Sequence, residues 1–113
     1  MSMIEFDEHK VKLTGMKPKL DGLSDSLNLG ACEEELERLQ AQIESPGFWD
    51  NPEKSQQIVM KTKSCESKLE KYKQMTAAWE DLMTICEMAE EMDDDSMLQE
   101  LKDGYQKLVD DME

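Results

Sequence analysis

The side chains that could do chemistry are three cysteines, one histidine and a run of three aspartates. Cysteine and histidine suit zinc binding or nucleophilic catalysis, and clustered carboxylates suit calcium. The cysteines, Cys32, Cys65 and Cys86, are odd in number and have no paired spacing, which indicates buried, reduced thiols rather than a disulfide framework. Cys65 and Cys86 would lie roughly 30 Å apart in a straight helix, too far for a shared metal or a disulfide.

The histidine and the aspartates do not complete a site either. His9 lies among charged residues near the N-terminus, so we expect a solvated side chain. A calcium loop that began at Asp93 would need glycine at its sixth position, where Leu98 stands. Asp93, Asp94 and Asp95 are therefore expected to cap a helix. We predict no catalytic, cofactor-binding or metal-binding residue, and we do not expect an enzyme.

Composition restricts the class of protein further. A chain of 113 residues fits one small domain, and 38% apolar, 5% aromatic and 35% charged residues are typical of amphipathic helices with wide solvated faces. The net charge of −14 repels phosphate, so a protein partner is favoured over nucleic acid for the chain as a whole. No apolar run is long enough to span a membrane and no signal peptide is recognisable, so we expect a cytoplasmic protein.

Apolar residues recur at the helical period along the whole chain and predict four helices, at about 4–28, 31–44, 52–92 and 95–112. Gly15, Pro18 and Gly22 predict a kink or break near Pro18 in the first helix, because proline in a helix interior costs roughly 3 kcal/mol. Leu29-Gly30 is the expected stop before the second helix. The last apolar stripe runs to Glu113 without a stop, so a fragment of a longer protein is expected.

These helices predict an all-α fold. The third would span on the order of 60 Å at 1.5 Å per residue. We therefore expect one domain over residues 1–113, an elongated antiparallel helical bundle or coiled-coil-like hairpin with one long central helix.

A turn between the second and third helices is the most specific local feature. Its predicted hinge residues are Phe48, Trp49, Asp50, Asn51, Pro52 and Glu53. Two caps are compatible with it: Asn51 before Pro52 at the first helical position, which we favour, or Asp50 with Glu53 in a capping-box spacing. Both aromatic rings are expected to be buried, as a staple between the two helices.

Charge is unevenly distributed along the chain. Residues 53–73 hold six lysines and three acids, whereas residues 87–103 hold eight carboxylates and one lysine. A solvated face explains such a pattern, and two surfaces for different partners would also explain it. The candidate interaction residues are Asp93, Asp94, Asp95, Lys54, Lys61 and Lys68.

Several short segments, in this order, resemble the N-terminal helical domain of bacterial peptide chain release factor 2. They are Glu5 to Glu8, Ser26 to Leu29, the Phe-Trp-Asp-Asn-Pro-Glu-Lys turn from Phe48 to Lys54, Lys68 to Tyr72, and Ala89 to Asp95. The sister family, release factor 1, has the helical domain but lacks the Phe-Trp-Asp turn. The chain is thus similar to the second factor over nearly its whole length.

The resemblance implies a ribosome-docking domain of a class I release factor, a protein that terminates translation at stop codons. The family's Ser-Pro-Phe decoding motif and Gly-Gly-Gln hydrolysis motif are absent from these residues. Implied partners are the ribosome, through a stalk-base protein and nearby ribosomal RNA, and the class II release-factor GTPase; no cofactor, membrane or small-molecule substrate is implied. The alternative is a free-standing helical adaptor or coiled-coil interaction module.

Overall fold

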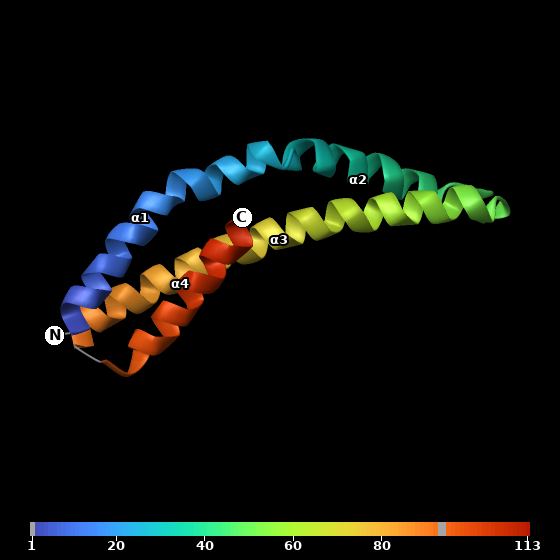
Figure 1. Ribbon diagram of the computed structural model, residues 1–113. Coiled ribbons are helices and arrows are strands. Elements are labelled where there is room, and N and C mark those ends of the chain that lie inside the picture. The colour runs from blue at the N-terminus through green and yellow to red at the C-terminus, as the bar shows by residue number, and fades with distance from the viewer. Residues whose placement is uncertain (1, 93–94) are drawn as a thin grey trace. The chain divides into compact units, whose positions relative to one another are not determined.

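The computed structural model describes residues 2–92 and 95–113, and all the regular elements in these residues are helical (Figure 1). The elements are α1 (Ser2–Ser26), α2 (Leu29–Glu44), the 3₁₀ turn η1 (Phe48–Asp50), α3 (Pro52–Met92), the 3₁₀ turn η2 (Asp95–Met97) and α4 (Leu98–Met112). The prediction of an all-α fold is confirmed. The chain divides into two compact units, unit 1 (residues 1–22 and 73–113) and unit 2 (residues 23–72).

Of the kink or break predicted near Pro18, the break is wrong, because helix α1 is continuous through this residue. Proline removes one backbone donor and leaves the carbonyl four residues earlier, at Thr14, without its helical partner. Pro18, Thr14, Gly15 and Gly22 are all exposed, so water can hydrate that carbonyl. The buried stripe on the other face of α1 then maintains the helix.

Helix α1 ends earlier than expected, and Asn28 provides the stop rather than Leu29-Gly30. Asn28 adopts the left-handed conformation, with φ 54° and ψ 46°, and its N–H donates to the Asp25 carbonyl at 3.0 Å. Asparagine tolerates this region better than other residues with a Cβ atom. Leu29, which was expected in the stop, is instead the first residue of α2 and is buried.

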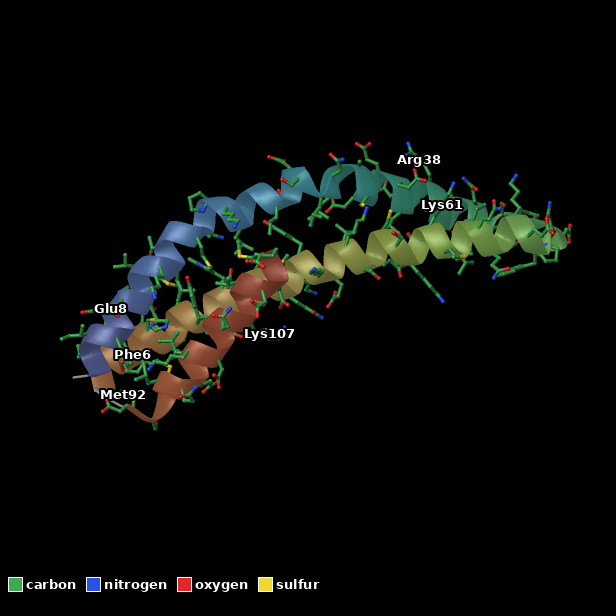
Figure 2. All side chains as sticks on the ribbon, viewed as in Figure 1. Phe6, Glu8, Arg38, Lys61, Met92 and Lys107 are labelled. Carbon is green, nitrogen blue, oxygen red and sulfur yellow. The ribbon has the colours of Figure 1, made fainter. Side chains whose placement is uncertain are left out.

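Unit 1 packs the first part of α1 against the second half of α3 and against α4. Phe6, labelled in Figure 2, opens a buried stripe on α1 whose spacing of seven residues is typical of helix-on-helix packing. The same spacing recurs on α3 and on α4. The buried residues of the three stripes are Phe6, Leu13 and Leu20; Met75, Leu82 and Ala89; and Leu101 and Leu108.

Trp79 ties α3 to α1 within unit 1. Its indole N–H donates to the carbonyl oxygen of Leu13 at 2.7 Å, and the ammonium of Lys17 lies 4.8 Å from its ring centroid. The ring is half-buried. An apolar body with a satisfied polar edge suits tryptophan at such a boundary.

His9 is only 9% exposed, so the expectation of a solvated histidine is wrong. It follows Phe6 by three residues and precedes Leu13 by four, which places it on the buried face of α1. Nδ1 hydrogen-bonds to the Glu5 carbonyl oxygen at 2.8 Å, and the ring meets Tyr105 of α4 edge-on, with centroids 5.5 Å apart. His9 is thus a packing residue between α1 and α4.

Unit 2 contains the end of α1, helix α2 and the first half of α3, and α2 and α3 run antiparallel on either side of η1 (Figure 1). Leu29, Cys32 and Leu39 are buried on α2, as are Ser55, Ile58 and Thr62 on α3. The buried hydroxyl of Thr62 is hydrogen-bonded within its own helix, because Thr62 Oγ1 donates to the Ile58 carbonyl at 2.9 Å. The turn that joins the two helices is therefore held at the end of a packed hairpin.

Candidate interaction site at the aromatic turn

Helix α2 ends through a serine and a glycine. Ser45 leaves the helical region, at φ −73° and ψ 148°, and both its N–H and its Oγ donate to the Gln42 carbonyl, at 3.2 Å and 2.6 Å. Gly47 then takes a positive φ of 79°, and a Cβ atom there would lie 3.1 Å from Asp50 Oδ2. Only glycine combines this conformation with that close approach at little cost.

Helix α3 begins with the predicted Asn51 cap. Asn51 Oδ1 accepts the N–H of Lys54 at 3.3 Å, and Pro52 takes the first helical position, where its missing donor is not needed. The capping-box alternative is not the one adopted, because Asp50 belongs to η1, and its N–H donates to the Gly47 carbonyl at 3.1 Å.

Ser55 connects the turn to α3 and was not recognised from sequence. It is 2% exposed, and its hydroxyl bonds to the backbone carbonyls of both Phe48 and Asn51. The sequence feature that could have indicated its role is its spacing, seven residues after Phe48 and four after Asn51. Because the hydroxyl bridges two carbonyls of the turn, Ser55 holds η1 against the first turn of α3.

The two aromatic rings of the turn differ in burial. Phe48 is half-buried, but Trp49 is 66% exposed, so the prediction that both rings are buried is wrong for Trp49. Consecutive residues of a 3₁₀ turn project about 120° apart, so only one of two neighbours can face the hairpin. The rings still touch edge to face, with centroids 4.7 Å apart at 82°, and Phe48 thereby supports the exposed indole.

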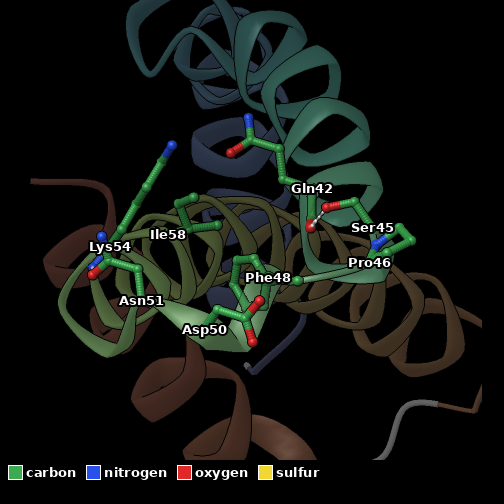
Figure 3. A pocket seen from close by; sticks show the side chains of 9 residues that line it. Gln42, Ser45, Pro46, Phe48, Asp50, Asn51, Lys54 and Ile58 are labelled. Carbon is green, nitrogen blue, oxygen red and sulfur yellow. Dashed lines mark hydrogen bonds between the residues drawn. The ribbon is translucent and has the colours of Figure 1, made fainter.

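A hollow of about 570 Å³ opens beside the turn (Figure 3). Phe48 and Ile58 supply apolar surface, and amide, carboxylate and ammonium groups surround it. Its lining comes from both helices and the turn: Gln42, Ser45, Pro46, Gly47, Phe48, Asp50, Asn51, Lys54 and Ile58. Apolar surface with a few polar groups suits recognition of a protruding side chain rather than bond-making.

Three lysines of α3 form a stripe that starts at this turn. Lys54, Lys61 and Lys68 recur every seven residues, and all three are exposed. Within residues 2–92 and 95–113 none of them forms an ion pair, unlike Arg38 of α2, which pairs with Glu35. Figure 2 labels Arg38 on α2 and Lys61 on α3. This lysine stripe offers three positive charges without an ion-pair partner among the described residues, and it runs along α3 from the aromatic turn.

The structure describes one of the three acidic candidate residues. Asp93 and Asp94 lie outside the described residues, and Asp95 is an exposed residue of η2. Helix α4 starts after η2, with Met97 at its N-cap and no side-chain cap. Of the candidate interaction residues, Lys54 lies at the aromatic turn among the hinge residues, whereas Lys61 and Lys68 lie further along α3 and Asp95 lies in unit 1.

Over the residues that have assigned positions, no group of three or more histidine, cysteine, aspartate or glutamate side chains could hold a metal ion. No helix in that same part of the chain is both long and apolar enough to cross a membrane. The geometry at the turn supports binding through an aromatic ring, a hollow and lysines.

Comparison with known proteins identifies the class. The PCRF domain family matches residues 32–113, which include most of α2, the aromatic turn, α3 and α4. The chain belongs to this PCRF-domain family.

Curated relatives narrow the assignment, since they are named peptide chain release factor 2. The relative from Staphylococcus saprophyticus is 31% identical over 91% of this chain and 28% of its own length. The one from Lactiplantibacillus plantarum is 27% identical over 99% of this chain and 30% of its own, and the one from Petrotoga mobilis is 30% identical over 84% and 25%. The resemblance to the N-terminal helical domain of release factor 2 is thus confirmed.

The chain spans less than a third of the length of these relatives. No solved structure matches it.

Proposed function

We propose that the chain is the ribosome-docking N-terminal domain of a class I release factor, which terminates translation at stop codons. It acts as a positioning arm, and decoding and peptidyl-tRNA hydrolysis are performed elsewhere in such a factor. The observation that carries the proposal is the aromatic turn: an exposed Trp49, a hollow and the lysine stripe, held at the end of a packed hairpin. Membership of the PCRF-domain family and relatives named release factor 2 support it.

The lysine stripe is proposed to contact ribosomal RNA. Lys54, Lys61 and Lys68 have no ion-pair partner among the described residues, so phosphates would not have to displace one. An exposed indole beside lysines can stack on an unpaired base while the ammonium groups contact the backbone. The net charge of −14 opposes nonspecific binding, so contact would be confined to this stripe.

The acidic region around η2 is proposed to face protein, either a basic stalk-base protein of the ribosome or the class II release-factor GTPase. Residues 87–103 carry eight carboxylates and only Lys102. Such a field would repel RNA and attract a basic protein surface. Charge reversal at Asp93, Asp94 and Asp95 is expected to weaken binding of that protein, and unchanged binding would remove this region from the interface.

Ribosome binding by the 113-residue chain tests the lysine stripe. The triple variant Lys54→Ala, Lys61→Ala, Lys68→Ala is compared with a control, Lys19→Ala, Lys63→Ala, Lys73→Ala, which makes the same charge change at exposed lysines outside the stripe. For an RNA contact, the dependence of log K on log[salt] is expected to lose a slope of about 2 to 3 in the stripe variant. An equal loss of slope in both variants would show that binding depends on the total charge of the chain and not on a site at the lysine stripe.

A release assay tests the division of roles. The isolated chain is expected to release no peptide from ribosomes paused at stop codons. In a full-length relative, deletion of the domain is expected to slow association or GTPase-assisted recycling more than single-turnover hydrolysis at saturation. Full association and recycling rates with lost hydrolysis would contradict the positioning role.

A free-standing adaptor remains the second candidate, because a hairpin with an exposed aromatic tip also suits a helical interaction module. The reading frame beyond Glu113 distinguishes the two. Codons for Ser-Pro-Phe and Gly-Gly-Gln would support the release factor, and their absence from the mature protein would support the adaptor.

A further inference from the structure

Two of the three cysteines lie on the two helices of the hairpin in unit 2. Cys32 of α2 is 7% exposed, and Cys65 of α3 is half-buried. Cys32 is near enough to Cys65 to raise the pKa of the Cys65 thiol. The third cysteine, Cys86, is fully buried in unit 1. The spacing of the cysteines along the chain did not predict this pair, because the hairpin brings together residues far apart in sequence.

The proximity follows from the register of the two helices. Cys32 precedes the buried Leu39 by seven residues, and Cys65 follows the buried Ile58 by seven. Seven residues are about two turns, or roughly 10.5 Å, and return to nearly the same face of a helix. In an antiparallel pair, equal steps away from the turn reach the same level on both helices. The cysteines therefore occupy the packing layer two turns beyond Leu39 and Ile58.

We propose that Cys32 and Cys65 form a reversible disulfide that locks α2 to α3 when the chain meets a small-molecule disulfide. Cys65, the more exposed thiol, loses its proton and attacks one sulfur of the oxidant, which releases one thiolate. The Cys32 thiolate then attacks the Cys65 sulfur of the mixed disulfide and displaces the second thiolate. The two leaving thiolates take up the two protons, so the oxidant is reduced to two thiols as the protein disulfide forms.

The surroundings make this reaction slow at neutral pH. Burial raises the pKa of the Cys65 thiol, the neighbouring Cys32 and the carboxylate of Glu35 raise it further, and Lys68 opposes them. Because the thiolate is the nucleophile, the rate is expected to rise about tenfold per pH unit below that pKa. The pair is therefore protected from oxidation under neutral, reducing conditions.

Oxidised glutathione is the probe, applied to the 113-residue chain at pH 7 and at pH 8. After free thiols are blocked, tryptic peptides 20–38 and 64–68 are expected to be joined, and peptide 74–102, with Cys86, is expected to carry a blocked free thiol. Dithiothreitol is expected to separate the joined peptides. A stable glutathione adduct on Cys65 with Cys32 free, or a covalent dimer, would overturn the proposal.

Two variants give matched controls. Cys32→Ser is expected to stop the reaction at the glutathione adduct of Cys65, and Cys86→Ser is expected to leave the cross-link unchanged. The wild-type peptide map tests the proposal even if a variant misfolds. The oxidised chain is expected to unfold at a higher urea concentration than the reduced chain. A lower urea midpoint for the oxidised chain would contradict the proposal that the disulfide locks α2 to α3. These measurements use the chain alone, so they do not depend on the proposed docking role.

Discussion

Trp49 and Trp79 show how differently two residues of one type are held. Trp49 is 66% exposed and touches Phe48, whereas Trp79 is half-buried, with its N–H bonded to the Leu13 carbonyl and Lys17 over its ring. Exposed side chains contribute little to stability, and buried aromatic ones contribute several kcal/mol. Trp49 is thus available for a partner, and Trp79 is part of the fold.

Replacement of each tryptophan by alanine tests this difference. Trp79→Ala is expected to lower the free energy of unfolding by roughly 2 to 4 kcal/mol, since it removes packing and the indole hydrogen bond to the Leu13 carbonyl. Trp49→Ala is expected to change it by less than about 1 kcal/mol. Urea denaturation followed by circular dichroism measures both. A larger loss for Trp49→Ala would place that indole in the core.

Ser55 holds the aromatic turn through its side-chain hydroxyl. Ser55→Ala removes the hydroxyl that bonds to the carbonyls of Phe48 and Asn51, and the loss is expected to be roughly 1 to 3 kcal/mol. The matched control is Ser64→Ala, an exposed serine on the same helix. Equal urea midpoints for the two variants would mean that the Ser55 hydroxyl does not hold the turn.

At the scale of the element, the glycines within helices differ in what surrounds them. A methyl group added at Gly15 of α1 would meet nothing within 4 Å, whereas one added at Gly104 of α4 would lie 2.7 Å from Leu82 Cδ2. Alanine favours helix over glycine by roughly 1 kcal/mol at either position. Only at Gly104 must a buried neighbour move to make room.

Gly15→Ala is therefore expected to stabilise the chain by about 0.5 to 1 kcal/mol. Gly104→Ala is expected to stabilise it less, by a difference of roughly 1 kcal/mol, because displacement of Leu82 offsets the gain in helix propensity. Thermal unfolding at matched concentration measures both. If the two variants gain equally, Leu82 is free to rotate away and α4 does not need the close approach.

For the whole molecule, net charge is the dominant electrostatic feature. Acidic residues outnumber basic ones, 27 to 13, and the ion pairs within the described residues are between exposed or partly exposed side chains. Such pairs contribute about 0 to 1 kcal/mol each, so repulsion among the excess carboxylates is expected to outweigh them. Salt should then stabilise the fold rather than weaken it.

A rise in NaCl from about 20 to 300 mM shortens the Debye length from roughly 20 to 6 Å. The urea midpoint at pH 7 is expected to increase over this range, because the repulsion is screened. Near the sequence pI of about 4.4 the net charge vanishes, and the same titration is expected to have a smaller effect. A midpoint that falls with salt at pH 7 would show that ion pairs dominate.

Local sequence determined the helices and the cap of the aromatic turn. The bounds expected for the third helix, 52–92, agree with α3, and Asn51 caps it as predicted. These features depend on residues within one or two turns of each other: the apolar period, a capping side chain and a proline at the first helical position. The ordered segments that resemble release factor 2 are likewise local, so the family was recognisable without a structure.

Tertiary structure decided which side chains are covered. The burial of His9 depends on Tyr105 of α4, the exposure of Trp49 on the direction of η1, and the influence of Cys32 on the Cys65 thiol on the register of the hairpin. Each of these three features involves residues on different elements or depends on how one element faces another. Periodicity along one helix specifies an apolar face but not what lies against it. The physical reason is that burial is a property of packed pairs of elements, whereas helix formation and capping are properties of neighbouring residues.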